Sequence, residues 1–384
     1  MERIPVFAPS LTGHESKYLE RALTELSLSG TSPIVQEFEN AFAKFIGAGD
    51  CVAVSNGTDA LVVAVQALGA GPGDEIILPN STIISDALAI TAAGATPVFV
   101  DVNESDWCLN VHEVEAKITS KTKGIIAVHL FGQSCDIDTL KELSEKNNLW
   151  LIEDAAQAMS TLWRGKKVGT FGDLGVYSFY ANKLMTTGEG GAVVIPEGHS
   201  RRKELKESLN CLRNLAFDPH PAKRFIHQTL SGNHRISGLQ AAFGLGQLSG
   251  ISELIKARET LRIQYHEALS AVDGIRIPEP HLMATPSLWM MAVSWSADRG
   301  RLAGEVADHL SAVGIETRRL FYPLNRQPAL SNYHRQADES FPISDALFEY
   351  GLYLPSFPGL TQEQVQHVVK ELTIALDPKR TALL

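Results

Sequence analysis

The feature that most constrains the fold is a regular alternation of short apolar runs and helical segments between residues 50 and 195. Apolar runs separated by stretches of helical periodicity predict a mostly parallel sheet covered by helices on both faces, an α/β architecture. In such a sheet, ligands bind at the carboxyl ends of the strands. The predicted strands cover residues 51–55, 75–78, 97–101, 124–128 and 149–153, with helices over about 58–68 and 82–93.

The pattern changes on both sides of this region. A helix is expected over about residues 15–26. After residue 195 come long helices over 201–214 and from 238 to about 272, and then a mixture with a strand over 289–296 and helices over 302–313 and 361–376. A chain of 384 residues is too long for one small core. We therefore predict a large domain over 1–250, with an N-terminal arm over 1–35, and a smaller α+β domain over 251–384.

Composition argues against several functional classes. The net charge of −10 disfavours nucleic acid or an anionic membrane as the main partner. The longest nearly apolar stretch, 76–100, contains Asp86 and two prolines, so it is not expected to span a membrane. The first residues lack the apolar core of a signal peptide. Four scattered cysteines and no histidine cluster favour reduced thiols, no metal site and a cytoplasmic protein.

One lysine has an unusual setting. Lys183 lies between an aromatic-rich strand that contains Ser178 and a turn with Gly188, Gly190 and Gly191. These glycines would let the backbone approach a bound ring. A buried amine in such a place can form a Schiff base with an aldehyde cofactor such as pyridoxal phosphate and later move protons. Ser178 could donate a hydrogen bond to the cofactor's phosphate.

Three other segments supply candidate partners, each with a simpler alternative. Asp154 ends a predicted strand and could pair with a pyridine nitrogen, with Gln157 near the phenolic oxygen, or Asp154 could simply cap a loop. The turn at Gly57 and Thr58 is either a phosphate cradle at a helix N-terminus or an ordinary cap. Asn233 and Arg235 precede a long helix, either as phosphate ligands across a dimer interface or as part of a polar loop.

In this order the motifs resemble those of the DegT/DnrJ/EryC1/StrS sugar aminotransferases, and most of all the GDP-perosamine synthase-like branch. The resemblance extends from Pro5 to Thr361, nearly the whole chain. It depends most on Ser55-Asn-Gly-Thr, Glu153-Asp-Ala-Ala-Gln, and Ser178-Phe-Tyr-Ala-Asn-Lys with Thr186-Thr-Gly-Glu-Gly-Gly.

The resemblance implies a fold type I pyridoxal phosphate (PLP) enzyme that works as a homodimer with its active site at the subunit interface. It implies that Lys183 forms the Schiff base. The lysine also separates this chain from the family's sugar dehydratases, which have a histidine at that position. The resemblance also implies that Asp154 pairs with the pyridine nitrogen and Gln157 with the phenolic oxygen. The implied phosphate ligands are Gly57, Thr58, Ser178 and, from the other subunit, Asn233.

The sequence departs from the family pattern at several positions. Ile83 stands where relatives usually carry an aromatic that stacks on the cofactor, although an isoleucine can still cover the ring face. The segments 319–325 and 233–238 also differ, so the identity of the sugar is less constrained than the cofactor chemistry. The candidate substrate-binding residues are His227, Arg235, Arg318, Tyr322 and Asn325.

These observations lead to one principal hypothesis and two alternatives. We expect a PLP-dependent aminotransferase that acts on a nucleotide-linked keto-deoxysugar, with L-glutamate as amino donor. One alternative replaces the acceptor with a cyclitol or an unlinked keto compound. The other is a catalytically silent PLP-binding regulatory protein. A nicotinamide-dependent enzyme is disfavoured because no G-x-G-x-x-G follows an early strand.

Overall fold

The computed structural model describes residues 3–218, 220–333 and 339–377. A seven-stranded sheet forms the centre of its larger part, in the order β1-β9-β8-β5-β4-β2-β3. β9 runs antiparallel to both of its neighbours, and the other pairs are parallel. This confirms the predicted α/β class. The strands are β1 (Asp50–Val54), β2 (Glu75–Pro79), β3 (Thr96–Val100), β4 (Thr122–Val128), β5 (Trp150–Asp154), β8 (Leu174–Ser178) and β9 (Gly191–Ile195).

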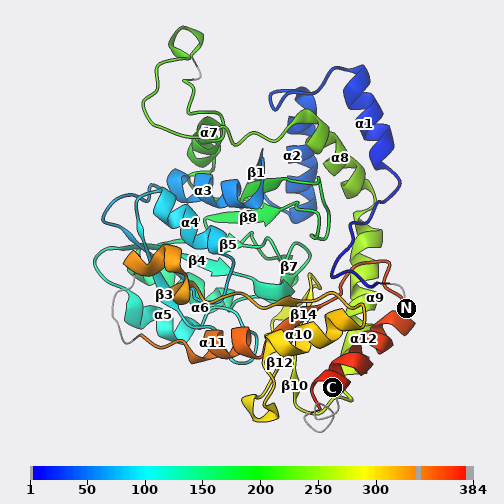
Figure 1. Cartoon of the computed structure of the whole chain (residues 1–384). Helices are drawn as coiled ribbons and strands as arrows, with labels where there is room; N and C mark the ends of the chain where they lie inside the picture. The colour runs from blue at the N-terminus through cyan, green and yellow to red at the C-terminus, as the bar shows by residue number, and fades with distance from the viewer. Residues whose placement is uncertain (1–2, 219, 334–338, 378–384) are drawn as a thin grey trace.

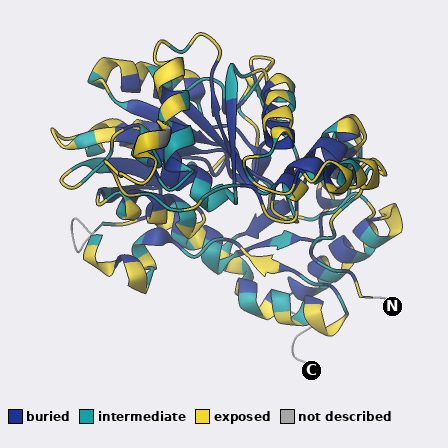
Figure 2. Cartoon of the chain, turned by 90° about the horizontal axis from the view of Figure 1, so that it is seen from above, coloured by how far each residue is buried: buried dark blue, intermediate teal, exposed yellow. Residues whose placement is uncertain are grey.

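Helices cover both faces of this sheet (Figures 1 and 2). Alternate side chains of β1 show why: Val52 and Val54 join a core with α3 and α7, whereas Cys51 and Ala53 join a core with α2 and α8. The helices are α1 (Glu15–Thr24), α2 (Pro33–Ile46), α3 (Gly57–Ala67), α4 (Ile84–Ala92), α5 (Val111–Lys117), α6 (Ile137–Asn147), α7 (Arg202–Leu212) and α8 (Gly238–Ser249).

A smaller antiparallel sheet, in the order β10-β12-β14-β13, lies at the other end of the molecule with its own core around Tyr265 and Val293 (Figure 1). Its strands are β10 (Ile275–Arg276), β12 (Met291–Trp295), β13 (Arg318–Arg319) and β14 (Gly351–Leu354). Its helices are α9 (Ile251–Leu269), α10 (Ala303–Ala312), α11 (Pro342–Glu349) and α12 (Gln362–Ala375). A third sheet contains β6 (Leu162–Trp163), β7 (Lys166–Lys167) and β11 (Ala284–Thr285), and short 3-10 helices cover Leu130–Gly132, Pro221–Lys223, Ala297–Arg299, Leu324–Arg326 and Pro328–Tyr333.

The structure corrects two expectations about helices. The single long helix predicted from residue 238 is two helices, because the chain bends at Gly250, between α8 and α9. A Cβ at Gly250 would lie 2.5 Å from the Cβ of Thr12, so a glycine at the bend allows a close contact with a residue distant in sequence. α2 was not predicted, although Ser32 and Pro33 form a common helix start. The division into domains at residue 250 remains a prediction.

None of the helices in the described ranges combines the length and hydrophobicity needed to cross a bilayer.

Candidate active site

A cavity of about 610 Å³ opens where β5 and β8 end and α3 begins. Carboxyl strand ends are the expected place for a ligand in such a sheet, and the volume is in the range of small-molecule sites. Seven of the eight predicted cofactor-binding residues line this cavity: Gly57, Thr58, Ile83, Asp154, Gln157, Ser178 and Lys183.

Asp154 is the last residue of β5 and is only 3% exposed. Its Oδ1 accepts a hydrogen bond from the N–H of Ala156 at 2.8 Å. Burial raises the pKa of Asp154, while the Ala156 N–H and the charge of Lys183 oppose that rise. The carboxylate is thus fixed in orientation and needs a cationic partner.

Lys183 lies opposite this carboxylate, in the loop between β8 and β9. Its Nζ is 4.3 Å from the ring centroid of Trp289. Burial lowers the pKa of Lys183 to about 8, although the Asp154 carboxylate acts in the other direction. A lysine of this kind has a substantial neutral fraction near neutral pH and can act as a nucleophile or base.

Glycines shape the loop that carries Lys183. Gly188 has a φ of +79°, in the region that favours glycine. A Cβ at Gly190 would lie 2.2 Å from Oγ1 of Thr187, and one at Gly191 would lie 2.4 Å from the carbonyl oxygen of Asn56. These glycines allow protein segments to pack closely, whereas the sequence analysis explained them by approach to a bound ring.

The start of α3 meets the end of β8 at the other side of the cavity. Asn56 is the N-cap and accepts from the Asp59 N–H at 2.8 Å. A Cβ at Gly57 would lie 2.9 Å from the Cβ of Ser178, so only glycine lets the helix N-terminus approach this serine. Thr58 Oγ1 is 2.8 Å from Oγ of Ser85. Asn56 therefore caps the helix, and the positive end of α3 still lies beside the hydroxyl groups of Thr58 and Ser178, where an anion could bind.

A hydrogen bond to its side-chain oxygen fixes the orientation of Gln157. Its Oε1 accepts from the N–H of Phe131 at 2.8 Å, which leaves the side-chain NH₂ as a donor for the cavity. Next to Asp154 in β5, the buried Glu153 accepts a hydrogen bond from His129 Nε2 at 3.0 Å. His129 Nδ1 in turn accepts from the Cys135 N–H at 3.2 Å, so Nε2 carries the proton.

Three aromatic side chains that sequence reasoning missed complete the cavity. Trp289, Phe321 and Tyr353 come from segments associated with the smaller sheet. Phe131 joins them, since its ring stacks against those of Trp289 and Phe321 with centroids 5.8 Å apart in both cases. Ile83, whose side chain is 44% exposed, also lines the cavity. The site thus has an aromatic wall even without an aromatic residue at position 83.

The profile of the DegT/DnrJ/EryC1/StrS aminotransferase family matches residues 9–373. The chain belongs to this family. It is 37% identical over 374 residues to a GDP-perosamine synthase of Caulobacter vibrioides, covering 97% of this chain and 98% of that relative. It is 35% identical over 365 residues to a GDP-perosamine synthase of Vibrio cholerae, covering 95% and 97%. The crystal structure of S. venezuelae DesV with a ketimine intermediate superposes with a TM-score of 0.88 at 30% identity, covering 98% of this chain and 99% of that one.

Aminotransferases of the DegT/DnrJ/EryC1/StrS family depend on PLP, and the residues of the cavity fit that group. Lys183 offers an amine for its aldehyde, and the buried Asp154 offers a carboxylate for its ring nitrogen. The close approach of Gly57 to Ser178 leaves a cradle at a helix N-terminus for its phosphate.

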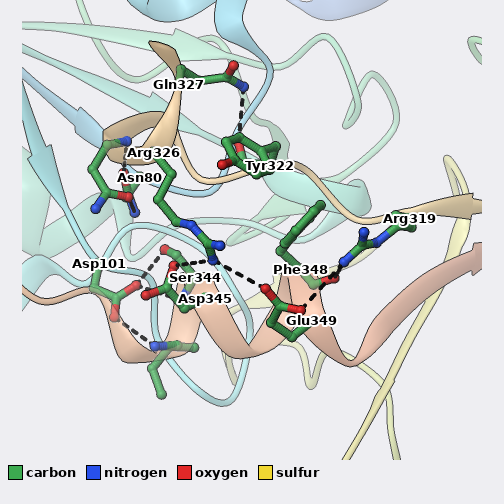
Figure 3. Close-up of polar contacts among 12 residues, drawn as sticks. Asn80, Asp101, Arg319, Tyr322, Arg326, Gln327, Ser344, Asp345, Phe348 and Glu349 are labelled. Atoms are coloured by element: carbon green, nitrogen blue, oxygen red, sulfur yellow. Dashed lines mark hydrogen bonds and ion pairs between the residues drawn. The ribbon is translucent and has the colours of Figure 1, made fainter. Parts of the chain in front are cut away.

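The candidate substrate residues near position 320 do not line this cavity. Arg318 forms an ion pair with Glu316. Tyr322 packs edge-on against Phe348 with centroids 4.8 Å apart (Figure 3). Asn325 exchanges hydrogen bonds with Asn80. In this family member, therefore, Phe321 is the residue of the segment that reaches the cavity.

The candidate residues of the segment before α8 also lie outside the cavity of their own chain. Arg235 donates to the side-chain oxygen of Asn214, and a ring nitrogen of His227 bonds the Leu215 carbonyl at 2.9 Å. Asn233 is exposed. The roles expected for Asn233, His227 and Arg235 in a site shared between two copies of the chain remain predictions.

Proposed function

We propose that this aminotransferase transfers an amino group from L-glutamate to a nucleotide-linked keto-deoxysugar. The observation that carries the proposal is the convergence of Lys183 and Asp154 in one cavity of a chain that matches named GDP-perosamine synthases over nearly its whole length. The large volume of the cavity and its aromatic wall suit a bulky, partly planar substrate.

When bound, PLP supplies an aldehyde and a ring that withdraws electrons from the reacting carbon. Lys183 provides the amine that binds the aldehyde, and once released it acts as the base that takes the proton from Cα of the amino donor. A pKa of about 8 suits that exchange near neutral pH. Asp154 keeps a proton on the ring nitrogen, and the NH₂ of Gln157 donates to the phenolic oxygen.

The phosphate end is held by the N-terminus of α3. The N–H groups of Gly57 and Thr58 and the hydroxyl groups of Thr58 and Ser178 provide donors there. We assign Asn233 of a second subunit to the same phosphate.

The surface supports a homodimer with a shared active site. The segment between α7 and α8 projects from the body of the molecule (Figure 1). Phe225, Ile226 and Leu230 on this segment are 78%, 55% and 88% exposed. Such apolar exposure is costly in a monomer and is typical of a surface that a partner covers. The four free cysteines suit a reducing compartment and support a cytoplasmic location.

A substrate panel tests the proposal. Purified holoenzyme is supplied with L-glutamate and with GDP- or dTDP-linked keto-deoxysugars, keto-cyclitols or unlinked keto sugars, and the aminated product is measured by mass spectrometry. We expect a nucleotide-linked sugar to be aminated at least about 100-fold faster, because an enzyme that uses the nucleotide loses that binding energy with truncated substrates. Lys183→Ala should remove the activity. Equal turnover of the unlinked compounds would overturn the assignment of the acceptor.

A further inference from the structure

Asp86 is a buried acidic residue that the proposed mechanism does not use. It lies in the first turn of α4, and none of its surface is exposed. Its Oδ2 accepts a hydrogen bond from Oγ1 of Thr82 at 2.8 Å. Its Oδ1 has no hydrogen-bond partner among the described residues. A buried acceptor oxygen in this state is costly unless it carries a proton.

Asp154 is an acidic neighbour with which such a proton can be shared. The Asp86 carboxyl group is within hydrogen-bonding reach of the carboxyl group of Asp154. Two ionised carboxylates cannot bond each other, since both only accept, and they repel strongly in a buried site. A single proton between them removes one charge and turns the repulsion into a hydrogen bond.

The surroundings decide which partner keeps the negative charge. Asp154 accepts a hydrogen bond from the Ala156 N–H and is stabilised by the positive charge of Lys183. Asp86 accepts a hydrogen bond from the Thr82 hydroxyl group, which suits the carbonyl oxygen of a protonated acid. Burial raises the pKa of Asp86 well above its usual range, and the charge of Asp154 raises it further. The proton therefore belongs on Oδ1 of Asp86, pointing at Asp154.

We propose that Asp86 is a positioning residue that stays protonated and donates a hydrogen bond to Asp154. The carboxylate of Asp154, which binds the PLP ring nitrogen, is then one member of a pair of carboxyl groups that share a proton. The inference rests on the proposed role of Asp154. The hydrogen bond fixes the Asp154 carboxylate from behind, where Asp86 is shielded from the cavity. It also lowers the basicity of Asp154, which leaves the proton on the ring nitrogen rather than on the carboxylate.

Two substitutions separate this role from a structural one. Asp86→Asn keeps the size, an oxygen for Thr82 and an N–H donor for Asp154, but it cannot titrate. Asp86→Ala removes the donor. Leu88→Ala is a matched control in the same helix, since Leu88 is 43% exposed and does not line the cavity.

The first measurement uses coenzyme-free protein and is independent of turnover. Infrared spectra of the wild type and of Leu88→Ala at pH 7.5 should contain the C=O stretching band of a protonated carboxylic acid. This band should be missing from Asp86→Asn. Its absence from the wild type at pH 7.5, or its persistence in Asp86→Asn, would overturn the proposal.

The second measurement is PLP affinity, titrated by absorbance between pH 6 and 9. Asp86→Asn should bind within about threefold of wild type, whereas Asp86→Ala should bind about 10- to 100-fold more weakly, the loss expected for a hydrogen bond to a charged group. Equal affinities for the two variants would count against the donor role. If Asp86→Ala does not fold, the infrared comparison of the wild type with Asp86→Asn decides alone. Neither measurement involves a sugar, so failure of the proposed acceptor would leave both results intact.

Discussion

Lys183 shows how strongly burial changes the chemistry of one side chain. Because the pKa of Lys183 is about 8, its amine is neutral in about half of the protein molecules at pH 8. An ordinary lysine is neutral in less than about 1% of molecules at that pH. Because the neutral form gains as the pH rises, PLP uptake by coenzyme-free protein should accelerate between pH 7 and 9 with a midpoint near 8. Stopped-flow absorbance measures this rate. The exposed Lys166 gives a control, Lys166→Ala, that should leave the profile unchanged. A midpoint near 10 would contradict the prediction.

The residues of the site differ in how well a sequence can reveal them. Lys183, Asp154 and Gly57 were predictable because each lies in a short motif at the end of a strand. In the sequence, Asp86 was noted only as a charged residue in a nearly apolar stretch, which indicated that this stretch does not span a membrane. Its interaction with Asp154 depends on how α4 packs against α3, β2 and β3, which no local pattern specifies.

At the level of elements, Glu153 joins β5 to the loop before β8. Its Oε1 accepts from the N–H groups of Phe171 and Gly172 at 2.6 and 2.7 Å, and its Oε2 accepts from Gly169 N–H at 2.7 Å as well as from His129. Glu153→Ala leaves these buried donors unsatisfied and should destabilise the protein by about 3–5 kcal/mol. Urea unfolding measures the loss, with the exposed Glu197→Ala as a control expected to change stability by less than about 0.5 kcal/mol.

The same carboxylate makes stability depend on pH. Burial alone would raise the pKa of Glu153, but His129 and the N–H groups of Gly169 and Gly172 outweigh it and hold that pKa below its ordinary value of 4.5. Its contribution is therefore complete above pH 4.5 and is lost as the pH falls through the lowered value. Unfolding curves from pH 6 to 3 should show wild type losing stability more steeply than Glu153→Ala.

The junction of α3 with β8 gives a second prediction for an element. Gly57→Ala places a Cβ 2.9 Å from that of Ser178 and forces the helix N-terminus away from it. We expect PLP affinity to fall by about tenfold or more while the fold is retained, since alanine is well tolerated in a helix. Gly304→Ala in α10 is the matched control, because a Cβ there meets nothing within 4 Å. Equal PLP affinities in fluorescence titrations of the two variants would contradict the proposal that the N-terminus of α3 binds the PLP phosphate.

The elements themselves were largely predictable where one pattern dominated. Apolar runs between 50 and 154 predicted five strands of the central sheet to within about two residues, because a buried parallel strand is apolar on both faces. The break between α8 and α9 was missed, since the contact of Gly250 with Thr12 that accompanies it joins segments far apart in sequence.

Considered as a whole, the molecule builds its cavity from two parts of the chain. Trp289, Phe321 and Tyr353 lie more than 100 residues after Lys183, yet they face the same space. The segment around residue 320 attracted notice for its unusual sequence, and its Phe321 lines the cavity. Arg318 pairs with Glu316 instead, and Tyr322 packs against Phe348 (Figure 3). Which side chain of an irregular segment points inward depends on tertiary packing and has no periodic signal.

The proposed sharing of active sites between subunits leads to a complementation experiment. Lys183→Ala and Asn233→Asp each damage one component of the site, and Asn233→Asp places a negative charge where the phosphate is proposed to bind. If Asn233 acts on the partner's site, a hybrid of the two variants contains one site in which both residues are intact. Random pairing in an equal mixture then restores about a quarter of wild-type activity in a C2 dimer. If Asn233 acts within its own chain, no intact site forms and the refolded mixture stays as inactive as its components. Activity measured after co-refolding, with each variant refolded alone as the control, therefore distinguishes a shared site from one built by a single chain.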